Sequence, residues 1–294
     1  MVFQIRLADK IIEIHSLYNN VFSMCRDYLE PPFAEEASMP TAKYPVEPSL
    51  RIEVTEEDIE REIRETARVR LEEMKLQHKL LGAAQFIKQP NDIDAYTPEI
   101  YETTAVYRKI ATEILIYDTF VMHGSVVATQ GAGYMFTAPS GVGKTTRTKL
   151  WLDHIPGSIV INGDKPLLHV TENEVYAYGT PWCGKENWNT NTSVPLRAIF
   201  LLERTREGED NTVTELQFSE AFPFLYRQTF RPDQSEARRK TLHLLLALSG
   251  RVSIYLLRCA PTPEAVLMAW KYAGNEKSEN LRHPDIESTI NYSG

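Results

Sequence analysis

The decisive stretch of the sequence is YMFTAPSGVGKTTRTKL, residues 134–150. Residues 134–136 are apolar and aromatic, which is typical of a buried strand. Residues 138–145 then match the phosphate-loop pattern G-x-x-x-x-G-K-[ST], except that Ala138 stands at the first glycine position. A relaxed pattern of this length also occurs by chance, as a glycine-rich turn before an ordinary helix. The apolar run before it and the helix-compatible sequence after it favour a phosphate-binding loop between a strand and a helix.

The residue types in this loop suit an anionic ligand. Gly141 and Gly143 can adopt backbone angles that a side chain forbids, so successive N–H groups can turn toward a phosphate. Lys144 would reach the outer phosphates as a compact cation, and Thr145 would offer its hydroxyl to Mg²⁺ at the positive end of the following helix. The predicted nucleotide-binding residues are Ser140, Gly141, Val142, Gly143, Lys144, Thr145 and Thr146.

A carboxylate follows a second predicted strand. Residues 158–162 are largely β-branched, and Asp164 comes directly after them and Gly163. Enough chain separates Lys144 from Asp164 for one helix and a returning strand. A Gly-Asp pair also favours an ordinary turn, and taken alone that interpretation is at least as good. Together with the phosphate loop, Asp164 is predicted to bind the metal ion.

A histidine precedes the phosphate loop. Residues 121–129 are predicted to form a strand, and residues 130–133 a turn that leads directly into the loop strand. His123 would then lie on a strand beside the loop strand. Most isolated histidines are structural or exposed, so the position alone leaves a structural and a catalytic role open.

Residues 122–124 (MHG), 139–145 (PSGVGKT), 162–168 (NGDKPLL) and 178–187 (YGTPWCGKEN) form a wider pattern. Together they resemble the superfamily of HPr kinase/phosphorylase and ATP-dependent phosphoenolpyruvate carboxykinase. The similarity is greatest to its short HPr-kinase-like (serine kinase-like) bacterial proteins, and it covers residues 123–204 best. The resemblance implies an α/β fold whose P-loop core has a mixed sheet, preceded here by an N-terminal α+β region.

The resemblance also implies roles for single residues. Lys144 would bind the phosphates, Thr145 and Asp164 would bind Mg²⁺, and His123 would assist the acid that handles the acceptor proton. Relatives usually carry two adjacent acids after the second strand, whereas this chain has Gly163 before Asp164. Either Asp164 performs both tasks, another acid such as Glu186 substitutes, or catalysis is weak or lost.

The segment 179–194 is a polar loop that contains two tryptophans. Long loops of this composition are functional or disordered, and exposed tryptophans argue against plain disorder. The loop is therefore a candidate acceptor-binding or lid loop, with Lys185, Glu186 and Asn187 as its candidate residues.

These features predict a Mg²⁺-dependent kinase that transfers the γ-phosphoryl group of ATP to a hydroxyl of a protein, peptide or small molecule. The alternative from another class is a nucleotide- or peptide-binding module with weak or no transfer activity, which the glycine at 163 favours. A carboxykinase reaction fits less well, because such enzymes are much longer. The sequence does not identify the acceptor.

Charge, hydropathy and cysteine content limit the classes of partner and the location that we expect for the protein. The 294 residues carry a net charge of −8, and no basic stripe is present, so nucleic acid is not expected as a partner. No apolar run is long enough to span a membrane, and no signal segment is recognised. Three widely spaced cysteines suggest free thiols in a reducing compartment, so a cytoplasmic location is expected. The oligomeric state stays open, with a homo-oligomer as one option.

The chain is predicted to comprise residues 1–118 as an N-terminal α+β region, 119–274 as the kinase-like core and 275–294 as a polar tail. Thr55 and Asp58 predict a capping box at the start of a long charged helix ending near Leu81. Pro98 predicts the start of another helix. Further strands are predicted at 51–54, 167–170, 175–178, 196–202 and 253–257. Three further helices are predicted: one capped by Ser219, one spanning 232–249 and one starting at Thr262.

Overall fold

The structure is a computed structural model. In it, residues 134–150 fold as the sequence predicts. Strand β6 (Ala132–Thr137) is followed by a loop and then by helix α4 (Lys144–His154). Most residues of β6 are buried, as its apolar composition requires. The phosphate-loop candidate therefore lies between a buried strand and a helix that begins at Lys144.

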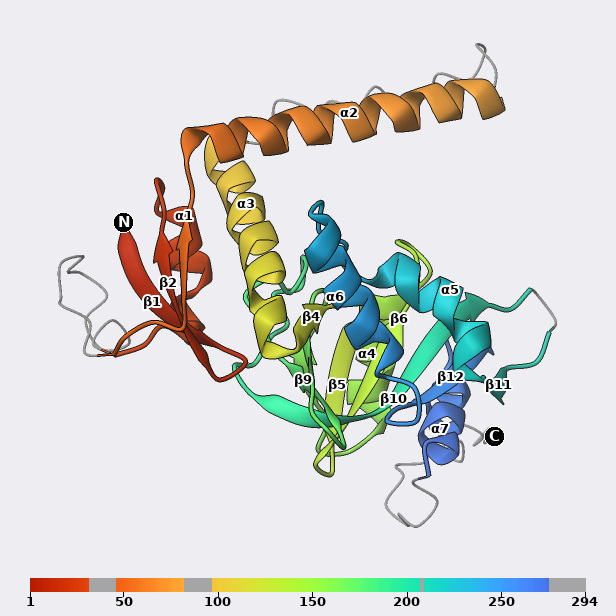
Figure 1. The fold of residues 1–294 in the computed structure, drawn as a ribbon. Helices are drawn as coiled ribbons and strands as arrows, with labels where there is room; N and C mark the ends of the chain where they lie inside the picture. The colour runs from red at the N-terminus through yellow and green to blue at the C-terminus, as the bar shows by residue number, and fades with distance from the viewer. Residues whose placement is uncertain (32–45, 82–96, 207–208, 275–294) are drawn as a thin grey trace, which may run out of the picture. The chain divides into compact units, whose positions relative to one another are not determined.

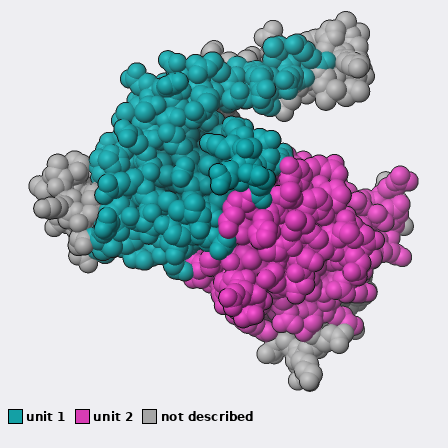
Figure 2. Space-filling view, viewed as in Figure 1, with its two compact units in different colours: residues 1–120, 231–239 teal, residues 121–230, 240–294 magenta. Residues whose placement is uncertain are grey.

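The structure describes residues 1–31, 46–81, 97–206 and 209–274. The predicted polar tail lies outside these residues. The chain forms two compact units, coloured separately in Figure 2. Unit 1 contains Met1–Phe120 and Arg231–Arg239, and unit 2 contains Val121–Phe230 and the chain from Lys240.

Unit 1 contains a small sheet. Strands β1 (Val2–Leu7) and β2 (Lys10–His15) form an antiparallel hairpin, and β3 (Leu50–Glu53) adds to β2 in parallel. The short helix α1 (Asn20–Met24) lies beside this hairpin (Figure 1), because Phe22 packs its ring 5.2 Å from that of Phe3. The predicted strand at 51–54 corresponds to β3.

Two longer helices also belong to unit 1. Helix α2 (Glu56–Leu81) begins with the predicted capping box: the Thr55 N–H donates to Asp58 Oδ2 (2.9 Å), and the Asp58 N–H donates to Thr55 Oγ1 (3.3 Å). Helix α3 (Pro98–Glu113) begins at the predicted proline. Lys109 of α3 places its Nζ 2.6 Å from Asp58 Oδ2, so an ion pair joins the two helices.

Unit 2 is built on a mixed sheet. Strands β5 (Ser125–Thr129) and β6 form an antiparallel hairpin, and β7 (Ile159–Asn162) pairs antiparallel with β5. On the other side of β6, strand β10 (Ser193–Arg204) runs parallel, and β12 (Ser253–Cys259) runs parallel to β10. Parallel and antiparallel pairs thus occur in one sheet, and the fold is mixed α/β.

Four shorter strands extend the sheet. The hairpin of β8 (Leu167–Val170) and β9 (Val175–Tyr178) was predicted, and β9 pairs with the first residues of β10. Strand β11 (Thr212–Glu215) pairs antiparallel with β12 and was not predicted. Strand β4 (Thr119–Val121) carries the chain from unit 1 into unit 2.

Helices α4 and α7 (Pro263–Tyr272) contribute to one core cluster of unit 2. The rings of Trp151 on α4 and Trp270 on α7 lie 5.6 Å apart, and the ring of Tyr134 on β6 lies 5.0 Å from Trp151. All three side chains are buried. These aromatic contacts fix α4, and with it the loop before it, against the sheet.

Two predicted helices needed correction. Helix α5 (Phe218–Gln228) is capped by Gln217 and not by Ser219, because the Gln217 N–H donates to Glu220 Oε2 at 2.8 Å. Helix α6 (Ser235–Leu246) is shorter than the predicted span 232–249 at both ends. None of the helices in the described ranges is long and apolar enough to cross a membrane.

Candidate functional site

Two glycines of the loop between β6 and α4 have positive backbone φ angles. Gly141 has a φ of +81° and Gly143 a φ of +123°, which L side chains rarely adopt. A Cβ at either position would meet no atom within 4 Å. Both glycines are therefore required by backbone angle rather than by lack of space.

Lys144 folds back over this loop. Its Nζ donates to the carbonyl oxygen of Ala138, the residue at the first glycine position of the pattern, at 3.1 Å. Burial lowers the pKa of Lys144, and the Asp164 carboxylate partly opposes this shift. Lys144 and Asp164 thus lie within electrostatic reach of each other. Thr145 is half-buried, whereas Ser140 and Thr146 are exposed.

His123 and Asp164 contact each other directly. His123 Nε2 lies 3.1 Å from Asp164 Oδ1. The N–H of Gly124 donates to the Asp164 carbonyl oxygen at 2.8 Å, which joins the two segments through their backbones as well. The prediction that His123 lies on a strand was wrong: it lies between β4 and β5. Because His123 lies outside a strand, its side chain does not have to point to one face of the sheet, and it turns toward Asp164.

The charge on Asp164 follows from its neighbours. Burial raises the pKa of this carboxyl, but the hydrogen bond from His123 and the nearby charges of Lys165 and Lys144 outweigh it, so the pKa lies below its ordinary value. The carboxylate is therefore ionised at neutral pH. An ionised oxygen ligand suits a hard cation such as Mg²⁺. A carboxylate of depressed pKa is at the same time a weak base.

Gln228, the last residue of α5, holds the other side of the His123 ring. Its Oε1 lies 2.9 Å from His123 Nδ1, and its carbonyl oxygen accepts the His123 N–H at 2.7 Å. Because the ionised Asp164 only accepts hydrogen bonds, Nε2 carries a proton. The sequence did not point to Gln228.

Asn162, the last residue of β7, positions Asp164. Its Oδ1 accepts the backbone N–H groups of Asp164 (2.9 Å) and Lys165 (2.7 Å). Its Nδ2 donates to the carbonyl oxygen and to Oγ1 of Thr180, both at 3.0 Å. The side chain is completely buried. Asn162 therefore fixes the turn that presents Asp164, in the manner of an Asx-turn.

The loop after β9 closely covers Gly163. A Cβ on Gly163 would lie 2.5 Å from the carbonyl oxygen of Cys183 and 3.4 Å from Trp188 Cβ. The Gly163 N–H also donates to the Trp188 carbonyl oxygen at 2.8 Å. Any side chain at position 163 would therefore require this loop to move. The glycine at this position therefore has a local structural cause.

The candidate acceptor residues lie in the same loop. Lys185, Glu186 and Asn187 are all exposed. Gly184, just before them, approaches Asp164, because a Cβ there would lie 3.3 Å from Asp164 Cβ. The structure thus brings Lys144, Asp164 and His123 together and leaves Lys185, Glu186 and Asn187 on an exposed loop that reaches Asp164.

The residues fit Mg²⁺ only in company with a phosphate. Within the described ranges, no group of three or more His, Cys, Asp or Glu side chains could hold a metal ion. Mg²⁺ bound to nucleotides often takes just one or two protein ligands and completes its shell with phosphate oxygens and water. Asp164 and Thr145 are the side chains that would serve as those ligands.

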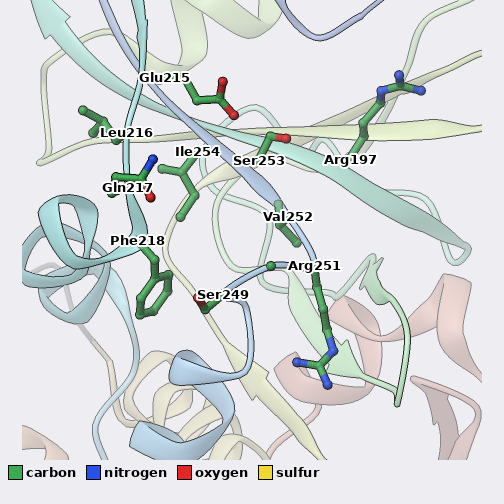
Figure 3. Close-up of a pocket in the computed structure, with 11 residues that line it drawn as sticks. Arg197, Glu215, Leu216, Gln217, Phe218, Ser249, Arg251, Val252, Ser253 and Ile254 are labelled. Carbon is green, nitrogen blue, oxygen red and sulfur yellow. The ribbon is translucent and has the colours of Figure 1, made fainter.

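A separate pocket of about 440 Å³ lies at the other end of the parallel strands (Figure 3). It is lined by Ser253 at the start of β12 and by Arg197 early in β10, whereas the phosphate loop follows the end of β6. Figure 3 shows the guanidinium groups of Arg197 and Arg251 pointing away from each other. Arg251 donates to the carbonyl oxygens of Ala247 (2.6 Å) and Glu172 (3.0 Å). This pocket is not part of the candidate site.

No family model matches the sequence, and no curated protein matches it. Among solved structures, the Hpr(Ser) kinase/phosphatase from Coxiella burnetii covers 53% of this chain and 95% of its own, at 10% sequence identity and a TM-score of 0.31. A similarity with so low a TM-score carries no argument about fold or function. The chain's own geometry shows a mixed α/β fold with Lys144, Asp164 and His123 gathered at one end of the sheet.

Proposed function

We propose that the protein transfers the γ-phosphoryl group of ATP to a hydroxyl, in a reaction that depends on Mg²⁺. The observation that carries the proposal is the cluster at the phosphate loop. A lysine at the start of a helix lies within electrostatic reach of an ionised aspartate, and that aspartate is hydrogen-bonded to a histidine. Phosphoryl transfer needs mainly positioning and charge neutralisation, which this set of groups supplies.

The proposal assigns a task to each of these residues. The loop N–H groups and Lys144 bind the phosphates, so that charge on the γ-phosphoryl group is offset as its bond to the leaving oxygen breaks. The acceptor oxygen forms the new bond to phosphorus, and its proton passes to Asp164. His123 orients Asp164 through Nε2. Bound Mg²⁺ would supply further positive charge beside the phosphates.

A second candidate function is nucleotide binding without transfer. Gly163 has no room for a side chain, so Asp164 would have to serve both as metal ligand and as proton acceptor. Its lowered pKa suits the first role better than the second. A chain with this site would bind Mg²⁺-ATP and turn it over very slowly or not at all.

The first experiment measures thermal stability of the full chain with and without Mg²⁺-ATP. Ligand binding to the native state alone stabilises it by about 2.7 kcal/mol at a hundredfold excess over Kd. We expect a rise in Tm for the wild type, none for Lys144→Ala, and an unchanged rise for Lys271→Ala, an exposed lysine on α7. The absence of a rise in the wild type would refute both functions.

The second experiment separates the two functions. The kinase proposal expects slow ATP consumption without an acceptor and none in Asp164→Asn, measured as ADP released over time. Binding with no turnover, even with a panel of serine peptides and small hydroxyl compounds, would support the binding module instead.

A further inference from the structure

Arg204 contacts the outside of the phosphate loop. Its Nε donates to the Val142 carbonyl oxygen at 3.2 Å, and its Nη2 donates to the Gly141 carbonyl oxygen. Arg204 is the last residue of β10. Because β10 runs parallel to β6 and pairs Leu201 with Thr137, its end arrives beside the loop that follows β6.

These two contacts set the direction of two peptide groups. In a trans peptide the C=O and the N–H point in opposite directions. When Arg204 holds the carbonyl oxygens of Gly141 and Val142, the N–H groups of Val142 and Gly143 therefore point away from it. The Val142 N–H makes a long contact of 3.4 Å to the Pro139 carbonyl oxygen within the loop, which an arriving phosphate would replace. An anion-binding loop needs its N–H groups on one side and its carbonyl oxygens on the other. The guanidinium charge also polarises both peptide groups, which strengthens their N–H groups as donors.

We propose that Arg204 is a positioning residue that holds the phosphate loop in its anion-receiving conformation before the nucleotide arrives. The inference rests on the proposed nucleotide site and extends it to a residue on another strand. Arg204 acts through the loop carbonyls and does not itself need to touch a phosphate. Its removal should therefore weaken nucleotide binding more than it slows the chemical step.

Arg258 provides a matched control. It lies on β12, opposite Glu203 in the β10–β12 register, and it is exposed like Arg204. Its Nη2 lies 2.8 Å from Glu203 Oε2, so it pairs with a carboxylate and not with the loop. Replacing either arginine with alanine removes one positive charge near the same end of the sheet. The two variants differ in whether the loop loses its contacts.

The experiment measures the Kd of Mg²⁺-ATP by calorimetry for the wild type, Arg204→Ala, Arg204→Lys and Arg258→Ala. Hydrogen bonds to a charged group typically shift equilibria by about tenfold or more. We expect Arg204→Ala to raise Kd by about tenfold or more and Arg258→Ala to change it less than about twofold. Arg204→Lys should fall between them, because an ammonium keeps the charge but lacks the planar fork that spans two carbonyls.

The separate effects of the substitution on KM and kcat distinguish a positioning role from a purely structural one. If the protein consumes ATP, Arg204→Ala should raise KM while kcat stays within about threefold of the wild type, as expected for lost ground-state binding. If Arg204→Ala does not fold, Arg204→Lys carries the test, and we expect its Kd to exceed that of the wild type by several-fold.

The outcomes distinguish this inference from the proposed function. If the wild type does not bind ATP, the proposed function fails. If the wild type binds and both Arg204 variants bind equally well, only the positioning role is refuted. Equal weakening by Arg204→Ala and Arg258→Ala would also refute it, because the effect would then come from general charge.

Discussion

Gly163 shows how one residue limits the chemistry of the site. The family resemblance made its missing carboxylate look like a lost catalytic group. In the structure, the loop containing Cys183 and Trp188 takes the space that a side chain would need. The glycine at position 163 and the close approach of this loop are therefore one feature, and an acid introduced at this position would not fit unless the loop moved.

We predict that Gly163→Asp destabilises the protein strongly. Its Cβ would lie 2.5 Å from the Cys183 carbonyl oxygen, and a backbone atom cannot move aside as cheaply as a flexible side chain. The free energy of unfolding should fall by about 3 kcal/mol or more, measured by urea denaturation followed by tryptophan fluorescence. Affinity for Mg²⁺-ATP should fall as well, because the loop also approaches Asp164.

Gly157→Asp is the control for that substitution. Gly157 has a φ of +73°, but a Cβ there would meet no atom within 4 Å. The control therefore carries only backbone strain, about 1–2 kcal/mol. Equal losses in the two variants would show that the contact with Cys183 is unimportant.

At the scale of helices and strands, local sequence signals predicted most elements well. The capping box of Thr55 and Asp58 marked the start of α2, and the proline at Pro98 marked α3, because such signals act within a few residues. The start of α5 was missed since a glutamine cap, Gln217, is a weaker signal than the nearby Ser219. Strand β11 was missed because it is short and buries only Val213, and its pairing with β12 is what makes it a strand.

We predict that the capping box of α2 makes stability depend on acid pH. Burial alone would raise the pKa of Asp58, but hydrogen bonds from Lys109 and Thr55 outweigh it and lower the pKa to about 2, from an ordinary 3.8. A lowered folded-state pKa stabilises the fold above the unfolded-state pKa. That contribution, about 2 kcal/mol, is lost as the pH falls from about 4 through 2.

Asp58→Asn tests this prediction. At pH 7 the variant should be less stable than the wild type by about 2 kcal/mol, and the difference should shrink between pH 4 and pH 2. Urea denaturation followed by circular dichroism at each pH measures it. Glu60→Gln, which removes an exposed partner of Arg64 on the same helix, should show no such trend. A constant difference at all pH values would contradict the assignment to the Asp58 charge.

At the scale of the whole molecule, the site could be predicted only in part. Lys144 and Asp164 were predicted as site residues because strand and loop motifs place them locally. Gln228 was missed because it is 105 residues from its partner His123, in a helix without any motif. Arg204 is similarly distant from Gly141, at 63 residues. Such contacts follow from the order of β6, β10 and β12 in the sheet, which no local pattern specifies.

The same strand order makes the C-terminal part of the described chain indispensable to unit 2. Strand β12 is the parallel neighbour of β10, and Trp270 on α7 packs against Trp151 and Tyr134 in the core. We predict that a chain ending at Gly250, which lacks β12 and α7, loses this core. It should show no cooperative thermal transition for unit 2 and no binding of Mg²⁺-ATP.

A chain ending at Gly274 is the control, because it keeps every member of the described core, and its near-ultraviolet circular dichroism and Tm should match those of the full chain. Retained nucleotide binding in the chain ending at Gly250 would mean that β6 and α4 hold the phosphate loop without the strands and helix that follow them, contrary to the packing described above.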